Sequence, residues 1–352
     1  MLKKVMLVAG AILTGVISSL ANAVVILQYH HVSDSTPKST SVTPAQFAEQ
    51  MQYLADNDFT VMSLTQAVEQ IKLQQTGSPK QIVITFDDGY DSIIDNAAPI
   101  LAKHQFPFTV FISVKPIDAG YKGMMSWQQI KKLTEQGATI ANHSWGHEHL
   151  IRYLANETTV QWRQRVGQNL LKTEAEIKQQ TGQSVKMLAY PYGEYNAELT
   201  SLLDELGFVG LGQQSGAAGN YSSLTALPRF PVAFDYADLS ELTIKFTSLN
   251  MPVIKQNITD PQLKNGQWRP LLEVTVDTTD IDKHQMMCFV QGQGSQPAIW
   301  INDNTFSVQA KRDLPAGRKR YNCTVPSKTQ TGYYWFSQAW VRPKNDGTWR
   351  EE

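Results

Sequence analysis

Residues 82–90 read Ile82-Val83-Ile84-Thr85-Phe86-Asp87-Asp88-Gly89-Tyr90. The opening run is short and apolar, which is typical of a strand buried on both faces. Two adjacent carboxylates and a glycine follow at once. The carboxylates of Asp87 and Asp88 repel one another unless a positive charge compensates them, for example a metal ion bound by one while the other acts as a base. We therefore expect a buried strand with a functional site at its carboxyl end.

Similar apolar runs recur on both sides of this stretch and alternate with amphipathic, helix-like segments. The predicted strands are 24–27, 59–62, 82–85, 108–112, 138–140, 185–189 and 208–211, and the predicted helices are 44–56, 64–73, 93–104, 127–136, 160–181 and 197–206. Strands that alternate with helices form a parallel sheet with helices outside it. The pattern over 24–250 therefore predicts a closed or nearly closed (β/α) barrel, whose site lies on the loops that follow the strands.

The remaining residues, 251–352, change to a period-two pattern and predict a small all-β, sandwich-like accessory domain. We expect strands at 271–276, 287–291 and 333–341, and a hairpin turn at 345–347 between aromatic strands. Five of the eight tryptophans lie here, either as a carbohydrate-binding surface or as the filling of a small core. The only two cysteines, Cys288 and Cys323, favour a disulfide, with two buried free thiols as the alternative.

The N-terminal residues 1–23 have the pattern of a removed secretory signal peptide: two lysines, an apolar run and a small-residue cleavage site, Ala21-Asn22-Ala23. An N-terminal membrane anchor is the alternative, and no later segment is apolar and long enough to span a bilayer. We expect a periplasmic or secreted protein. Because 31 basic residues nearly balance 32 acidic ones without a basic run, a nucleic-acid partner is set aside.

A histidine pair follows another predicted strand, in His143-Ser144-Trp145-Gly146-His147. A single helical turn between the histidines can aim both imidazoles at one point. Together with Asp88 they make a three-ligand set that leaves positions open for water, as catalytic metal sites require. Such ligands accept zinc, cobalt, nickel or iron. A non-haem Fe(II) oxygenase uses the same residue types, but its carboxylate commonly lies two residues from a histidine on a β-fold. Asp88 precedes the histidine pair by 55 residues and follows a strand of the predicted barrel.

The two motifs together resemble the first two motifs of the polysaccharide deacetylase family, the NodB-homology or carbohydrate esterase family 4 enzymes, over residues 24–250. This resemblance implies an irregular (β/α)7 barrel and a metal-dependent deacetylase, with zinc as the most expected ion. It implies that Asp87 is the general base and that Asp88, His143 and His147 bind the metal. A third motif, Tyr190-Pro191-Tyr192-Gly193, implies that the backbone N–H of Tyr192 stabilises the oxyanion.

The chain departs from the family where an arginine usually orients the base carboxylate, because Ala189 occupies that position. A resemblance to one branch of the family implies that Arg229 takes the role of that arginine. The alternative for Arg229 is a surface ion pair. The absence of an arginine at position 189 also leaves open the alternative that the protein binds glycans without catalysis. Against this alternative, binding alone would not need a base beside a metal.

The late histidine motif that supplies the general acid is also missing, and Tyr29-His30-His31 follows the first strand instead. This arrangement resembles a circularly permuted branch that includes the poly-N-acetylglucosamine deacetylases. It implies that His30 is the acid, with its neighbour His31 as the alternative.

The expected activity is therefore the hydrolysis of N-acetyl groups on an N-acetylglucosamine-containing exopolysaccharide, which yields a free amine and acetate. Chitin oligosaccharides and peptidoglycan are alternative substrates, since loops that one sequence does not reveal select the glycan. Trp145 and Tyr192 are candidates for stacking against a sugar ring.

Overall fold

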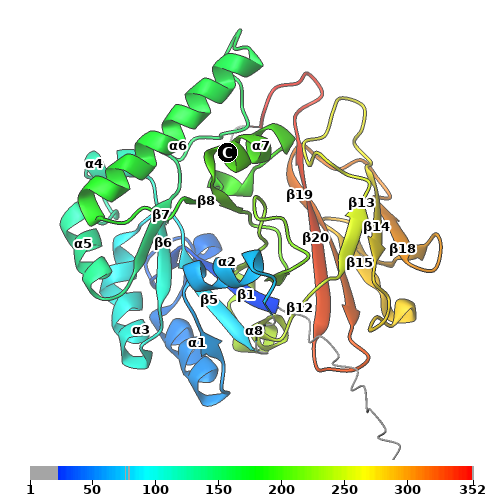
Figure 1. Cartoon of the computed structure of the whole chain (residues 1–352), viewed down its shortest axis with the longest axis horizontal. Helices are drawn as coiled ribbons and strands as arrows, with labels where there is room; N and C mark the ends of the chain where they lie inside the picture. Colours follow the sequence, from blue (N-terminus) through cyan, green and yellow to red (C-terminus); the bar gives the residue numbers. More distant parts are fainter. Residues whose placement is uncertain (1–22, 76, 78–79, 351–352) are drawn as a thin grey trace, which may run out of the picture.

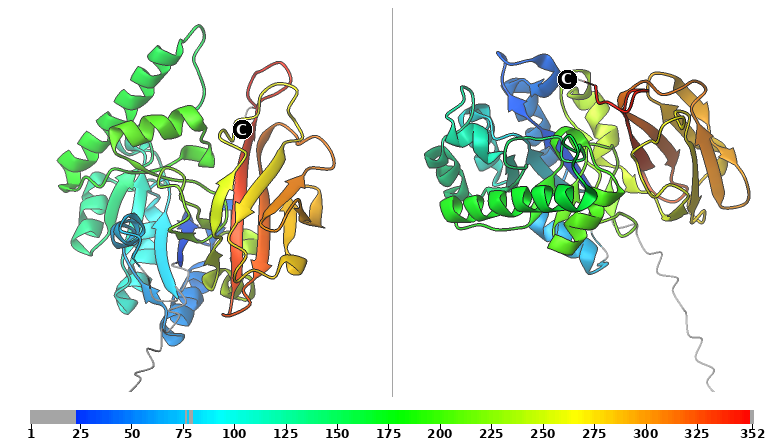
Figure 2. Two further views of the ribbon diagram at one scale, coloured as in Figure 1. Left: turned by 45° about the vertical axis from the view of Figure 1, so that its right-hand side comes forward. Right: turned by 90° about the horizontal axis from the view of Figure 1, so that it is seen from above.

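The computed structural model describes residues 23–75, 77 and 80–350. The expected signal peptide lies outside the described residues except for Ala23. No helix in the described part of the chain combines the length and the hydropathy needed to cross a bilayer. The molecule consists of a curled parallel sheet covered by helices and, beside it, two antiparallel sheets (Figure 1, Figure 2).

The curled sheet is built from buried apolar strands that run parallel to one another. In spatial order they are β1 (Ala23–Tyr29), β5 (Gln81–Phe86), β6 (Phe108–Ile112), β7 (Thr139–Asn142), β8 (Met187–Ala189) and β9 (Val209–Leu211). Leu227 bridges Leu211 of β9, and β11 (Phe230–Pro231) pairs with β1, so residues 227–231 join the two ends of the sheet. This architecture confirms the expected irregular α/β barrel.

The helices match the sequence pattern closely because polar caps mark where they begin. They are α1 (Pro44–Asp56), α2 (Leu64–Lys72), α3 (Ala98–His104), α5 (Trp127–Glu135), α6 (Thr159–Thr181) and α7 (Ala197–Leu206). Reciprocal capping boxes open α1, α2, α5 and α6. The sequence analysis missed α4 (Val114–Asp118) and α8 (Leu239–Phe246), which have five and eight residues.

Short elements complete this part of the chain. The predicted strand 59–62 is reduced to β4 (Thr60–Val61), which pairs only with the beginning of β5. A π-helical turn, Ile93–Ala97, precedes α3. The other short strands are β2 (His31–Val32), β3 (Ser41–Val42) and β10 (Ala218–Gly219).

The two sheets of the tail are antiparallel except for one short pair of strands, and they pack against each other as a sandwich. One contains β12 (Leu249–Asn250), β20 (Tyr333–Arg342), β19 (Gly317–Pro326), β15 (Met287–Val290) and β16 (Gly294–Pro297), and the other contains β13 (Val253–Gln256), β14 (Leu271–Val276), β18 (Thr305–Gln309) and β17 (Ile299–Trp300). A separate apolar core fills the space between them. The all-β character expected for the tail is thereby confirmed.

The hairpin expected at 345–347 is wrong. A tight turn does form, because the Lys344 N–H donates to the Thr348 carbonyl at 2.7 Å, but no strand follows it among the described residues. The long hairpin pairs β19 with β20 instead. Asn345-Asp346-Gly347 therefore forms the predicted turn. Trp349, which was expected in a following strand, packs instead against an apolar cluster that contains residues of α6 and α7.

The barrel and the sandwich are in close contact. β12, which follows α8, pairs with β20, and Val341 of β20 packs with Trp162 and Leu199 of the barrel helices. The exact division near residue 250 stays a prediction, since the last residues of the expected barrel domain belong to a sheet of the sandwich.

Cys288 and Cys323 form the expected disulfide between directly opposed positions of β15 and β19. Replacing both cysteines with serine is expected to lower the free energy of unfolding by about 2–4 kcal/mol, because the bond restricts the unfolded chain. Denaturant unfolding of the double variant measures this loss, and reduced wild-type protein is the control. Equal stability of all three forms would contradict a stabilising role.

Candidate metal and catalytic site

The candidate residues meet because the parallel strands of the barrel end at the same edge. Asp87 and Asp88 follow β5, His143 follows β7, and His30 follows β1. Chemistry in such barrels lies at this edge. The sequence analysis placed each residue at a strand end, and the structure brings the strand ends together.

Asp88, His143 and His147 form a compact cluster whose donor atoms all lie within 4.8 Å of one another. Asp88 Oδ1 lies 3.2 Å from His143 Nε2 and 3.4 Å from His147 Nε2. His143 Nδ1 donates to the Ala189 carbonyl at 2.7 Å, which leaves Nε2 facing Asp88. An imidazole held in this way is a typical metal ligand, so this donor set fits a divalent cation.

The electrostatics also suit a cation. Burial lowers the pKa of His147 to about 4, so its imidazole is neutral near pH 7 and able to bind a metal. Burial opposes ionisation of Asp88, but hydrogen bonding and charge from His143 hold the pKa of its carboxyl below the usual value. An ionised carboxylate and a neutral imidazole are the forms that coordinate.

The loops that carry the ligands adopt left-handed backbone conformations. Positive φ occurs at Asp88 (74°), Ser144 (66°) and His147 (60°). Such strain costs on the order of 1–3 kcal/mol per residue and concentrates at functional sites. The Ser144 N–H donates to Asn142 Oδ1, and its hydroxyl donates to Glu148. Both partners are functional supports that the sequence analysis missed.

Asp87 and Arg229 form a fully buried, bidentate ion pair. Arg229 Nη1 and Nη2 lie 2.7 and 2.8 Å from the two carboxylate oxygens, and Gln28 Nε2 donates to Oδ2 at 2.6 Å. Both charged side chains have 0% exposure, which excludes the surface ion pair considered for Arg229. The Arg229 Nε–H donates to the Gly212 carbonyl and fixes the fork. Burial alone would raise the pKa of Asp87, but Arg229 holds it below its usual value.

The two N-terminal histidines have different surroundings. His30 is partly exposed and acts electrostatically on both Asp87 and Asp88, so it lies at the cluster. The His31 ring stacks on Tyr90 at 3.6 Å between centroids, and its Nδ1 is buried without a partner among the described residues. His31 also interacts electrostatically with Asp88, so the stacking of its ring on Tyr90 is what distinguishes the two histidines.

Tyr192 lies at the rim of the cluster, in a tight turn that follows β8, with φ of 61°. Its ring stacks on His149 at 3.8 Å and meets the edge of His147 at 4.4 Å. Trp145 lies elsewhere on the histidine loop, and Lys172 Nζ lies 3.3 Å from its ring centroid. One face of Trp145 is therefore already covered.

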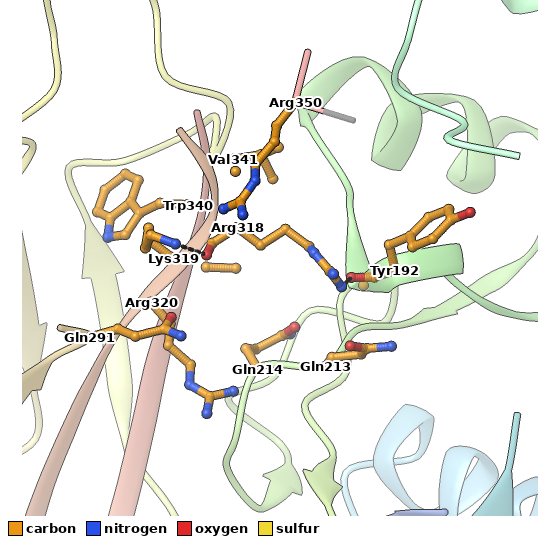
Figure 3. A pocket seen from close by; sticks show the side chains of 13 residues that line it. Tyr192, Gln213, Gln214, Gln291, Arg318, Lys319, Arg320, Trp340, Val341 and Arg350 are labelled. Atoms are coloured by element: carbon orange, nitrogen blue, oxygen red, sulfur yellow. Dashed lines mark hydrogen bonds between the residues drawn. The ribbon is translucent and has the colours of Figure 1, made fainter. Parts of the chain in front are cut away.

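A residue of the sandwich also reaches this rim. Arg318 of β19 donates a hydrogen bond to the Tyr192 carbonyl, and its guanidinium lies 5.7 Å from the Tyr192 ring centroid (Figure 3). The sequence analysis missed this contact, because no local pattern relates residues that are so far apart in the chain.

The fold and the site together define a barrel with a carboxylate–histidine cluster and a buried aspartate–arginine pair at its strand ends. Residues 74–211 match the family model of the polysaccharide deacetylases. This part of the chain thus matches the polysaccharide deacetylases, as the resemblance indicated.

The sequence relatives described below also carry the names of deacetylases. YxkH of Bacillus subtilis (strain 168) is 28% identical over 59% of this chain and 71% of its own length. The poly-beta-1,6-N-acetyl-D-glucosamine N-deacetylase of Staphylococcus epidermidis is 26% identical over 61% of this chain and 80% of its own. The protein of that name from Escherichia coli (strain K12) is 23% identical over 60% of this chain, but the match spans only 37% of its length.

Solved structures show the same fold. The Streptococcus pyogenes deacetylase PplD, in complex with acetate, has a TM-score of 0.58 at 20% identity and covers 64% of this chain and 99% of its own. IcaB from Ammonifex degensii has a TM-score of 0.56 at 21% identity and covers 64% of this chain and 97% of its own.

Zinc is expected to bind the metal-free protein and raise its melting temperature, since a ligand at 100 times its Kd adds about 2.7 kcal/mol to the free energy of unfolding. His143→Ala should abolish this shift, because it removes one of three donors. Calorimetric titration with zinc measures the binding directly. His284→Ala, an exposed histidine of the sandwich, is the matched control and should bind like wild type. Equal binding by both variants would place the ion elsewhere.

Proposed function

We propose that this chain is a metal-dependent deacetylase that removes N-acetyl groups from an N-acetylglucosamine-containing exopolysaccharide and releases acetate. The observation that carries the proposal is a buried carboxylate, Asp87, fixed by Arg229 beside the Asp88, His143 and His147 cluster. The names of the relatives from Staphylococcus epidermidis and Escherichia coli support this substrate class.

Each residue has a distinct part in the hydrolysis. A divalent ion, for which zinc is our first expectation, would be held by Asp88, His143 and His147. Such an ion would supply Lewis acidity toward the acetyl carbonyl and lower the pKa of a bound water. Asp87 accepts a proton from the water that attacks the carbonyl carbon. Arg229 keeps that carboxylate ionised and correctly oriented.

The oxyanion and the leaving group need separate help. The backbone N–H of Tyr192 donates to the carbonyl oxygen as negative charge grows there. His30 donates a proton to the amide nitrogen as the carbon–nitrogen bond breaks, because an unprotonated amine leaves poorly. The products are acetate and a glycan with a free amine.

The proposal includes the organisation expected from the sequence: a removed signal peptide over 1–23, a catalytic barrel over 24–250 and an accessory domain over 251–352. It also includes a periplasmic or secreted location, where an acetylated polysaccharide is accessible. The hydrogen bonds between Arg229 and Asp87 support a catalytic protein over the non-catalytic alternative, because they give Arg229 a position from which it can take the role left open by Ala189.

Acetate release by the purified chain tests the proposal. β-1,6- and β-1,4-linked N-acetylglucosamine oligomers are offered in parallel, and Asp87→Asn and a chelator serve as controls. We expect release that both controls abolish, with the β-1,6-linked oligomer preferred. Acetate released equally by Asp87→Asn would overturn the assignment of the base, and no release despite bound metal would exclude both glycans as substrates.

A further inference from the structure

A cavity lies between the barrel and the sandwich, and its lining does not include the candidate metal ligands Asp88, His143 and His147, which mark the acetyl site of the proposed reaction. It has a volume of about 350 Å³ and is bordered by the barrel segment 230–245 and by β15, β19 and β20. One carboxylate, Glu241 of α8, lines it, and so do two cationic side chains, Lys245 of α8 and Arg320 of β19. Neither takes part in the proposed hydrolysis.

Lys245 is buried and Arg320 is partly buried, and each has a buried nitrogen without a hydrogen-bond partner among the described residues. Lys245 is 8% exposed, and its Nζ has no hydrogen-bond partner among the described residues. The Nε of Arg320 is likewise buried and unpartnered. A buried charge without a partner is costly, and proteins normally supply an opposite charge or a ligand.

The neighbouring groups do not neutralise this pair. Burial, together with the charge of Arg320, lowers the pKa of Lys245, although Glu241 on the same helix opposes that shift. Burial also lowers the pKa of Arg320, whose guanidinium hydrogen-bonds the Tyr236 hydroxyl. Lys245 Nζ lies 5.0 Å from the Tyr236 ring centroid, a weak cation–π contact. Glu241 therefore offsets one of the two positive charges that line the cavity, and the lining keeps a net positive charge that favours an anion.

The rest of the cavity suits a sugar ring rather than a bare ion. Tyr236, Phe289 and Met287 line it and remain 54%, 41% and 39% exposed. Exposed aromatic faces offer large contact area at low entropic cost and stack on apolar sugar faces. The chemistry of the lining therefore combines a stacking surface with a pair of cations.

Arg320 also connects this cavity to the rim of the acetyl site. It lines a neighbouring cavity of about 280 Å³ together with Tyr192, Arg318 and Arg350, and Figure 3 shows its guanidinium extending toward Gln214. None of the described residues that line this neighbouring cavity is acidic. A glycan chain that leaves the acetyl site past Tyr192 meets a cationic path that ends at Lys245.

We propose that Lys245 and Arg320 form a subsite for a carboxylate carried by the polysaccharide, so that the preferred substrate is an acidic N-acetylated glycan. The inference rests on the proposed deacetylase function and names its substrate class more narrowly. An ammonium sugar, the product of the reaction, would be disfavoured at the same subsite.

Binding is measured by calorimetry on the full wild-type chain, kept metal-free with a chelator so that no turnover occurs. The probes are an oligosaccharide of alternating N-acetylglucosamine and glucuronate, a neutral β-1,6-linked N-acetylglucosamine oligomer of the same length, and inorganic phosphate. The acidic oligosaccharide is expected to bind about tenfold more tightly than the neutral one, the effect of one charge-assisted hydrogen bond.

Lys245→Met should remove this preference, and so should Arg320→Gln, which provides a second variant if the first does not fold. Lys103→Met, an exposed lysine of α3 on the barrel, is the matched control and should retain it. Equal affinity of wild type for both oligosaccharides would overturn the subsite. Phosphate binding as tight as that of the acidic oligosaccharide, and lost in Lys245→Met, would also overturn it in favour of a free-anion site.

Acetate release with metal restored separates this inference from the proposed function. Deacetylation of the neutral oligomer without any charge preference in binding would overturn the subsite and leave the function standing. Tight binding of the acidic oligosaccharide without acetate from either oligomer would support the subsite and overturn the function.

Discussion

Arg229→Met is expected to lower the free energy of unfolding by about 3–5 kcal/mol, because it leaves the fully buried Asp87 carboxylate without its charged partner. Acetate release should fall by on the order of 10²-fold or more, since the base loses the fork that orients it. Denaturant unfolding and initial-rate measurements give the two quantities. If Arg229 only stabilised the fold through its ion pair, the correctly folded Arg229→Met variant would release acetate at the wild-type rate.

The pH dependence of acetate release distinguishes a role of Arg229 in orienting Asp87 from a role in folding alone. In wild type, Arg229 depresses the pKa of Asp87, so the pair stabilises the protein above the unfolded pKa of about 3.9 and loses that stability as the pH falls through the lower folded value. Without the arginine, burial raises the pKa of Asp87. The acid limb of the rate profile in Arg229→Met should therefore move to higher pH, and an unchanged limb would contradict the assigned role.

Two further variants control this experiment. Arg229→Lys keeps a charge but not the bidentate fork, so its rate and stability should fall between those of wild type and Arg229→Met. The double variant Asp87→Asn/Arg229→Met should be more stable than Arg229→Met alone, because no ionised carboxylate remains buried. A double variant less stable than the single would show that the loss arises from packing.

The fold was largely predictable because its signals are local. Apolar runs, polar caps and terminal glycines each act within a few residues, and they located six of the barrel helices, among them α1 and α6. Segment 227–231 escaped detection, since it is a short bridge whose partners in β1 and β9 are distant in the chain. The turn at 345–347 misled for the opposite reason, because a strong local signal does not decide whether a strand follows.

The site was predictable only where its residues form motifs. The Asp87-Asp88 and His143–His147 patterns are contiguous in sequence, so their meeting followed from the barrel topology. Gln28 and Arg318 support the site through single long-range contacts that leave no sequence pattern. The orphaned Lys245 also gave no signal, because a lysine on an amphipathic helix is ordinarily exposed.

His30→Ala is expected to lower the rate of acetate release from an N-acetylated oligomer by roughly 10²–10⁴-fold, the usual contribution of a general acid. His31→Ala should cost far less, because His31 stacks on Tyr90 and its Nδ1 is enclosed. Rates of both variants on the same oligomer, at saturating metal, make the comparison. A larger loss in His31→Ala would transfer the role to that residue.

A change of leaving group in the substrate shows whether His30 acts as a general acid or only maintains the structure of the site. An amine must be protonated to leave, whereas the phenolate of a 4-nitrophenyl acetate ester departs without help. The loss in His30→Ala should therefore nearly vanish on the ester, while Asp87→Asn should be impaired on both substrates because attack by water is common to them. If His30→Ala were equally impaired on amide and ester, His30 would act on the attack step or on the architecture of the site, and the proton for the amine would have to come from another group at the rim.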